Sequence, residues 1–142
     1  MIETVKIIIP GTPVSKGRPR FAVRGKYVQT YTPEKTAAYE KLVRSAWEQA
    51  GGKTAPQGAA VRVDIVASFP IPGSKSKKIK AAMAAGEIPH LSRPDVDNIA
   101  KAVLDALNGC AYHDDSQIVS LTVEKQYAET PRCAVRLEWE EA

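Results

Sequence analysis

The sequence predicts an α/β fold in which one mixed β-sheet packs against helices in a single small domain. Segments with alternating or β-branched apolar residues are interspersed with segments whose apolar residues recur at helical spacing, as expected of strands and helices that share one core. The chain has 142 residues, of which 44% are hydrophobic and 25% charged, so it can bury a core of ordinary size. We therefore expect residues 1–142 to form one domain.

The front of the chain predicts a strand followed by a hairpin. Residues 5–9 are mostly β-branched and end at Pro10, which is typical of a strand that runs into a loop. Apolar residues alternate over 21–28 around Gly25, which indicates a short hairpin. Basic residues should lie on or near the tip of this hairpin, namely Arg20, Arg24 and Lys26.

A scaffold helix should follow the hairpin. Thr32 suits the N-cap and Pro33 the first helical position, and the helix should run to about residue 50, where Gly51 and Gly52 stop it. Its apolar residues at helical spacing are Ala38, Leu42, Val43, Ala46 and Trp47.

Three more strands and a lysine-rich segment complete the expected sheet. Residues 61–69 alternate and then become apolar, which favours a strand in the middle of the sheet. Residues 118–123 and 133–139 also alternate, and we expect them to pair antiparallel and close the sheet. After the central strand, residues 74–86 predict a short helix with lysines at one end. This lysine cluster is either a solvated surface or a phosphate contact.

Composition excludes several classes of protein. No segment approaches the roughly 20 apolar residues of a membrane span, and no signal peptide precedes the first strand, so we expect a cytoplasmic protein without a membrane. Cys110 and Cys133 are too few and too far apart for a thiolate zinc site. His90 and His113 likewise lack the spacing of a metal-binding pair.

Five aspartates fall between residues 93 and 117 of an otherwise basic chain. A helix should begin at or just after Asp95 and run to Asn108, because the preceding Arg93 stands before a proline and is biased away from helix. Its apolar arc comprises Val96, Ile99, Ala100, Val103, Leu104 and Leu107, and its polar arc comprises Asp97, Asn98, Lys101, Asp105 and Asn108. Asp114 and Asp115 follow the Gly109 stop and precede a strand whose start can return toward the helix's beginning.

Clustered carboxylates repel one another unless a divalent cation lies among them, so this segment is a candidate metal site. Oxygen ligands without cysteine or paired histidine favour Mg²⁺, for which Mn²⁺ can substitute. Lys101, one turn from Asp97, can orient an attacking water or stabilise transition-state charge. The plain alternative is a solvated helix with an aspartate cap and an ordinary Asp97 to Lys101 ion pair.

The charge distribution indicates a polyanionic substrate. Residues 1–94 carry a formal charge of +10 and residues 95–142 a formal charge of −6. Lysines and arginines neutralise phosphates while an acidic segment holds a metal, so nucleic acid is the first substrate to test.

These residues resemble the RusA family of Holliday junction resolvases, which prophages often carry. The resemblance rests on Asp-x-Asp-Asn-x-x-Lys at 95–101 and Asp-Asp-x-Gln at 114–117, and it extends to residues 13–20 and 31–33 at the front. The lysine-rich segment 74–90 lies outside the core motif, so its part in DNA contact is open.

The resemblance implies a homodimeric, Mg²⁺-dependent endonuclease of RusA-like α/β fold that cuts four-way DNA junctions by paired symmetric nicks in recombination and repair, without a nucleotide cofactor. The implied metal ligands are Asp95, Asp97 and Asp115, and the implied catalytic lysine is Lys101, with Asp114 auxiliary. For DNA contact we expect Lys16, Arg18, Arg20, Lys75, Lys77 and Lys78. The competing hypotheses are a metal-dependent phosphoesterase acting on flapped DNA or RNA, and a non-catalytic junction-binding protein.

Overall fold

The predicted α/β architecture is confirmed by a computed structural model, which describes residues 1–17, 20–25, 27–31 and 33–141. The main sheet has four strands in the order β1 (Ile2–Pro10), β6 (Arg132–Glu140), β4 (Val61–Pro70) and β5 (Ile118–Ala128). Strand β6 runs antiparallel to both neighbours, whereas β4 and β5 are parallel, so the sheet is mixed.

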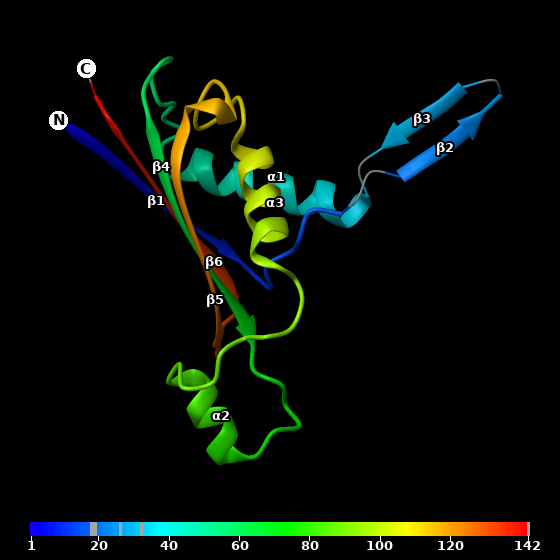
Figure 1. Ribbon diagram of the computed structural model, residues 1–142, viewed down its shortest axis with the longest axis vertical. Coiled ribbons are helices and arrows are strands. Elements are labelled where there is room, and N and C mark those ends of the chain that lie inside the picture. The colour runs from blue at the N-terminus through cyan, green and yellow to red at the C-terminus, as the bar shows by residue number, and fades with distance from the viewer. Residues whose placement is uncertain (18–19, 26, 32, 142) are drawn as a thin grey trace.

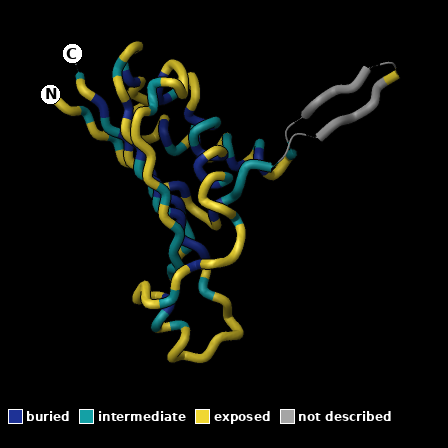
Figure 2. The backbone as a smooth tube through the Cα atoms, viewed as in Figure 1, coloured by how far each residue is buried: buried dark blue, intermediate teal, exposed yellow. Residues whose placement is uncertain are grey.

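The helices cover one face of this sheet. Helices α1 (Glu34–Gln49) and α3 (Val96–Leu107) lie side by side on that face, and α2 (Lys77–Ala84) lies beyond the end of β4 (Figure 1). The odd-numbered residues of the central strands face the helices and are buried, among them Val63, Ile65, Val135 and Leu137. Within the described ranges, the opposite face of the sheet carries no helix, so the even-numbered residues of its strands are more exposed (Figure 2).

The expected pairing of the last two strands is wrong. Strands β5 and β6 do not pair with each other, because β4 lies between them. A parallel strand needs a long crossover, and residues 71–117 with α2 and α3 supply it, which carries β5 to the outer side of β4. Alternation in the sequence therefore predicted the strands correctly and their partners incorrectly.

The predicted hairpin is confirmed, and it stands apart from the main sheet. Strands β2 (Arg20–Arg24) and β3 (Tyr27–Tyr31) pair antiparallel around an exposed Gly25 with φ +63° (Figure 1). Lys26, expected near the tip, lies outside the described residues.

Helix α1 begins later than predicted, and of its predicted apolar residues Val43 and Trp47 are buried. Pro33, with ψ 142°, is the N-cap rather than the first helical residue, and the proposed cap Thr32 lies outside the described residues. The buried stripe comprises Thr36, Tyr39, Val43 and Trp47. Ala38 and Leu42 are exposed, because the helix turns its polar Thr36 and aromatic Tyr39 toward the core instead.

Helix α3 has the predicted bounds, with Asp95 as N-cap and Asn108 as C-cap. Its buried face comprises Ile99, Ala100, Ala102, Val103, Ala106 and Leu107. This face includes two alanines that were not expected, and Val96 is 43% exposed. Small side chains let the helix approach the sheet closely, so the packed arc is rotated from the one that side-chain hydrophobicity predicts.

No helix within the described part of the chain is long and apolar enough to cross a membrane.

His90 packs where the segment that carries α2 returns to the sheet. The ring stacks on Phe69 at 4.3 Å between centroids and lies 4.9 Å from Tyr127, and Nδ1 has no hydrogen-bond partner among the described residues. Burial lowers the pKa of His90, and the charge of Lys125 lowers it further. The folded protein therefore favours the neutral form of this imidazole.

Replacing His90 with Phe should keep the aromatic stack and remove this titration. An unfolded histidine has a pKa of about 6.5 and takes up a proton that the folded state disfavours. The wild type should therefore lose unfolding free energy relative to His90→Phe as the pH falls from about 7 to about 5. Urea denaturation across that range measures the difference, and a difference that stays constant with pH would contradict the assignment.

Candidate active site

Asp95 stands at the start of α3 with a carboxylate that does not cap the helix. Its backbone has the extended dihedrals of an N-cap residue, φ −75° and ψ 155°, yet its side chain makes no capping hydrogen bond. A short polar N-cap side chain ordinarily accepts a bond from the first turn. Asp95 is exposed, so its carboxylate is available to a cation or a substrate.

The solvent-facing side of α3 carries the other charged residues of the motif. Asp97 and Lys101 are exposed and lie four residues apart, so they share this side of the helix. Among the ion pairs of residues 1–17, 20–25, 27–31 and 33–141, none involves Lys101. The ordinary surface ion pair that the plain alternative required is therefore not formed here.

The two adjacent acids after α3 have different surroundings. The Asp114 carboxylate accepts a hydrogen bond from Ser116 N at 3.1 Å and caps the short 3₁₀ helix η1 (Asp115–Gln117). Hydrogen bonding by Ser116, through its side chain first and its backbone N second, lowers the pKa of Asp114. Asp115 is exposed, and its side chain makes no hydrogen bond or ion pair with the described residues. The geometry thus gives Asp114 a structural task and leaves Asp115 available.

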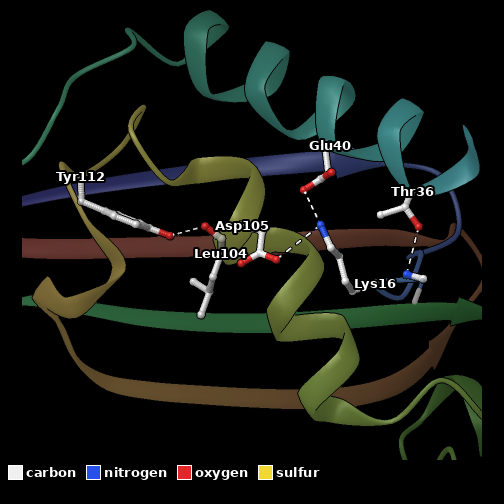
Figure 3. A network of polar contacts seen from close by, with 7 residues as sticks. Lys16, Thr36, Glu40, Leu104, Asp105 and Tyr112 are labelled. Atoms are coloured by element: carbon white, nitrogen blue, oxygen red, sulfur yellow. Dashed lines mark hydrogen bonds and ion pairs between the residues drawn. The ribbon is translucent and has the colours of Figure 1, made fainter. Parts of the chain in front are cut away.

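Tyr112 fixes the loop that carries these acids against the last turns of α3. Its buried hydroxyl donates to Leu104 O at 2.5 Å (Figure 3). The Tyr112 backbone also forms an isolated bridge with Asn108. Burial raises the pKa of Tyr112, and the nearby carboxylates of Asp115 and Asp105 raise it further. These contacts of Tyr112 hold the loop that leads to Asp115 against the C-terminal half of α3.

Gln117 fastens the same loop to the segment before β4. Its Oε1 accepts from His113 N at 2.8 Å and from Asp114 N at 3.2 Å. Its Nε2 donates to Pro56 O at 2.9 Å and to Ala59 O at 3.0 Å. One amide side chain thus satisfies both of its donors and both acceptor sites, which holds the Asp115 loop in one position.

The expectation that Asp115 returns to the beginning of the helix is wrong within one chain. Helix α3 has 12 residues and spans about 18 Å, with Asp95 and Asp97 at one end and Asp115 beside the other. In the described ranges, no group of three or more His, Cys, Asp or Glu side chains could hold a metal ion. Gly109, with φ +78°, reverses the chain immediately after the helix and so keeps the loop at its C-terminal end.

A surface pocket opens at the start of α3. It has a volume of about 270 Å³ and is lined by Ser15, Arg93, Pro94, Asp95 and Asn98. Of these residues, the sequence analysis assigned a role in the site to Asp95 alone. Ser15 comes from the loop after β1 and falls inside the motif at 13–20, which was the one signal that could have placed it here.

The basic residues expected to contact DNA have dissimilar surroundings. Lys75, Lys77 and Lys78 are exposed at the start of α2. Lys16 is 16% exposed and lies between Glu40 and Asp105. Arg18 lies outside the described residues, and Arg20 begins β2, where only its backbone is described.

Comparison with known proteins bears directly on this arrangement. Residues 10–138 match the family described as "Endodeoxyribonuclease RusA". The chain belongs to the RusA family. It is also 37% identical over 138 residues to "Uncharacterized protein YqaN" of Bacillus subtilis (strain 168), a match that covers 96% of each chain.

Membership in the RusA family establishes the class of activity. The chain is an endonuclease, an enzyme that hydrolyses DNA, and the match covers every element from the end of β1 to β6. The resemblance inferred from residues 95–101 and 114–117 is thus confirmed. The roles of individual aspartates and lysines stay predictions, to be tested one residue at a time.

Removing the Gln117 side chain should loosen the loop that bears Asp115. Gln117→Ala deletes four hydrogen bonds, so we expect it to lower the free energy of unfolding by about 2 to 4 kcal/mol. Gln126→Ala is the matched control. Within the part of the chain that the structure describes, the Gln126 side chain makes one hydrogen bond, to Ser68, and its loss should cost about 1 kcal/mol. Urea denaturation measures both, and equal losses would show that the four bonds do not hold the loop.

Proposed function

We propose that this chain is a Mg²⁺-dependent, structure-selective endodeoxyribonuclease that resolves four-way DNA junctions by paired symmetric nicks. The observation that carries the proposal is the start of α3 in a RusA-family chain, where Asp95 does not cap its helix and Asp97 and Lys101 face solvent together. Exposed carboxylates at the start of a helix suit an oxygen-ligand cation such as Mg²⁺, and Mn²⁺ can substitute.

Each residue has a distinct part in this proposal. Asp95, Asp97 and Asp115 hold the cation, which supplies Lewis-acid stabilisation of the phosphoryl charge and a water of lowered pKa. Lys101 lies one turn along α3 from Asp97 and offers an ammonium to the developing charge. Hydrolysis then leaves a 5′-phosphate and a 3′-hydroxyl.

The separation of the acids leads us to place the cation between two chains. Asp95 and Asp97 lie at one end of α3 and Asp115 lies beside the other, so a single chain does not assemble the three ligands. A homodimer in which each copy presents Asp115 to the other's Asp95 and Asp97 completes two equivalent sites. Two sites on one symmetric dimer match the two strands that a junction resolvase nicks.

The basic surface of α2 supplies phosphate contacts. Lys75, Lys77 and Lys78 are exposed beside a helix start that has no acidic residue in its first turn, so their charges are not offset locally. Arg18 and Arg20, at the start of the hairpin sequence, are further members of the expected set, whereas Lys16 is considered separately below. Contacts of this kind position DNA without reading its sequence.

The first test replaces one proposed ligand. Asp97→Asn should lower cleavage of a synthetic four-way junction in Mg²⁺ by about 100-fold or more, because an amide oxygen is a weaker cation ligand than a carboxylate. Junction binding should persist. Asp64→Asn is the matched control, since Asp64 lies on the helix-free face of the sheet and pairs with Arg136. Undiminished cutting by Asp97→Asn would remove Asp97 from the site.

The same assay separates the competing functions. Preferential cutting of flapped DNA or RNA by the wild type would favour a phosphoesterase with another substrate. Junction binding that is equal in EDTA and Mg²⁺, with no cleavage in either, would favour a non-catalytic binding protein.

The second test asks whether two chains share a site. Asp97→Asn and Asp115→Asn should each be inactive alone, yet a mixture that exchanges subunits should recover nicking. In a mixed dimer with shared sites, one site carries both substitutions and the other carries neither. Recovery of about half the wild-type nicking per mixed dimer is expected from one intact site in two. If all ligands came from one chain, every mixed dimer would stay inactive.

A further inference from the structure

Lys16 occupies a place that does not suit a residue in contact with DNA. Its Nζ lies 3.2 Å from Glu40 Oε2 on α1 and 3.4 Å from Asp105 Oδ2 on α3 (Figure 3). The Lys16 and Glu40 side chains are only 16% and 14% exposed. To reach a phosphate, Lys16 would have to leave two carboxylates that are then uncompensated and partly buried, which is costly.

The backbone around Lys16 is fixed to the same two helices. Lys16 N donates to Asn98 O at 3.0 Å, within the first turn of α3. Gly17 N donates to Thr36 Oγ1 at 3.0 Å, in the first turn of α1. A Cβ atom on Gly17 would lie 2.9 Å from the same oxygen, so only glycine fits without a shift. The loop after β1 is thereby fastened across the starts of both helices.

Ser15, the residue before Lys16, is positioned by these contacts at the pocket that Asp95 lines. Ser15 lines the pocket of about 270 Å³ together with Arg93, Asp95 and Asn98. A serine hydroxyl is a neutral donor, so it can bond a phosphoryl oxygen beside a carboxylate without pairing with that carboxylate as an ammonium does. To make this bond, the Ser15 hydroxyl must be held within hydrogen-bond distance of the phosphoryl oxygen. The anchored Lys16 is the adjacent residue and can hold Ser15 there.

We infer that Lys16 is a positioning residue whose ion pairs with Glu40 and Asp105 hold Ser15 in the wall of the Asp95 pocket, where the Ser15 hydroxyl donates to a phosphoryl oxygen of bound DNA. This inference rests on the proposed function and revises the expectation that Lys16 itself contacts phosphate. It also gives roles to Glu40 and Asp105, two acids outside the proposed cation site.

Two observables distinguish a positioning lysine from a phosphate contact. Removing a phosphate contact reduces the slope of log binding constant against log salt concentration by about 0.9. Removing a positioning residue leaves that slope unchanged and lowers the cleavage rate. Its effect must also vanish once its partners are neutral, because coupled residues do not act additively.

The experiment compares Lys16→Met in the wild-type chain and in the Glu40→Gln, Asp105→Asn background. We expect Lys16→Met to lower the single-turnover rate of junction cleavage about 10-fold with an unchanged salt slope, and to have less than about a twofold effect in the neutral background. Lys41→Met is the matched control, since Lys41 is exposed on α1. A slope reduced by about 0.9, with equal losses of binding in both backgrounds, would overturn the positioning role. An unchanged cleavage rate would overturn it too.

A second variant keeps the inference testable if Lys16→Met fails to fold. Glu40→Gln retains the shape of the side chain and weakens the anchor, so it should lower the cleavage rate in the same direction, and an unchanged rate would count against the anchor. Ser15→Ala should lower the rate by about 10-fold or more with junction binding intact, whereas Ser45→Ala, at an exposed position of α1, should not. A Ser15→Ala rate equal to that of the wild type would overturn the role of Ser15.

The salt slopes are measured in EDTA, so they report on Lys16 whether or not the wild type cleaves. Wild-type cleavage in Mg²⁺ tests the proposed function separately. If the wild type does not cleave and Lys16→Met leaves the salt slope unchanged, the proposed function is wrong. The conclusion that Lys16 makes no phosphate contact would still stand. An active wild type with a reduced slope would overturn this inference alone.

Discussion

The packing of α3 against the sheet and α1 is the constraint on which the rest of the structure depends. Ile99, Val103 and Leu107 are at most 1% exposed, so the rotation of this helix is fixed by burial of its apolar side. That rotation turns Asp97 and Lys101 to solvent, sets Leu104 O where the Tyr112 hydroxyl reaches it, and brings Asp105 to Lys16. The packing of the apolar core thus determines which charged side chains of α3 face solvent.

Local pattern predicted the elements of this fold well and their relations poorly. The bounds of α3, the position of β4 in the middle of the sheet and the hairpin around Gly25 followed from periodicity and cap residues. The β5 partner did not, because alternation marks which residues face a core but not which strand lies alongside. The two alanines on the buried side of α3 were missed because small side chains carry little hydrophobic signal.

For the candidate site too, the sequence identified the residues but not their arrangement in space. Motif spacing selected Asp95, Asp97, Lys101 and Asp115, and the family match supports the motif as a whole. The sequence could not show that Gly109 keeps Asp115 beside the C-terminal end of α3, since that depends on how one turn is oriented. Nor could it assign Glu40, whose partnership with Lys16 joins residues 24 positions apart. Side-chain contacts of this range require the assembled fold.

The parallel pairing of β4 and β5 also governs how the chain reaches its native state. The hairpin of β2 and β3 closes over a few residues, whereas β5 cannot join β4 until residues 71–117 have crossed the sheet. Pairings of long sequence separation carry a greater closure entropy and form slowly. Segment 71–117 carries α3, so the crossover that brings β5 to the outer side of β4 also lays the exposed helix side with Asp97 and Lys101 over the sheet.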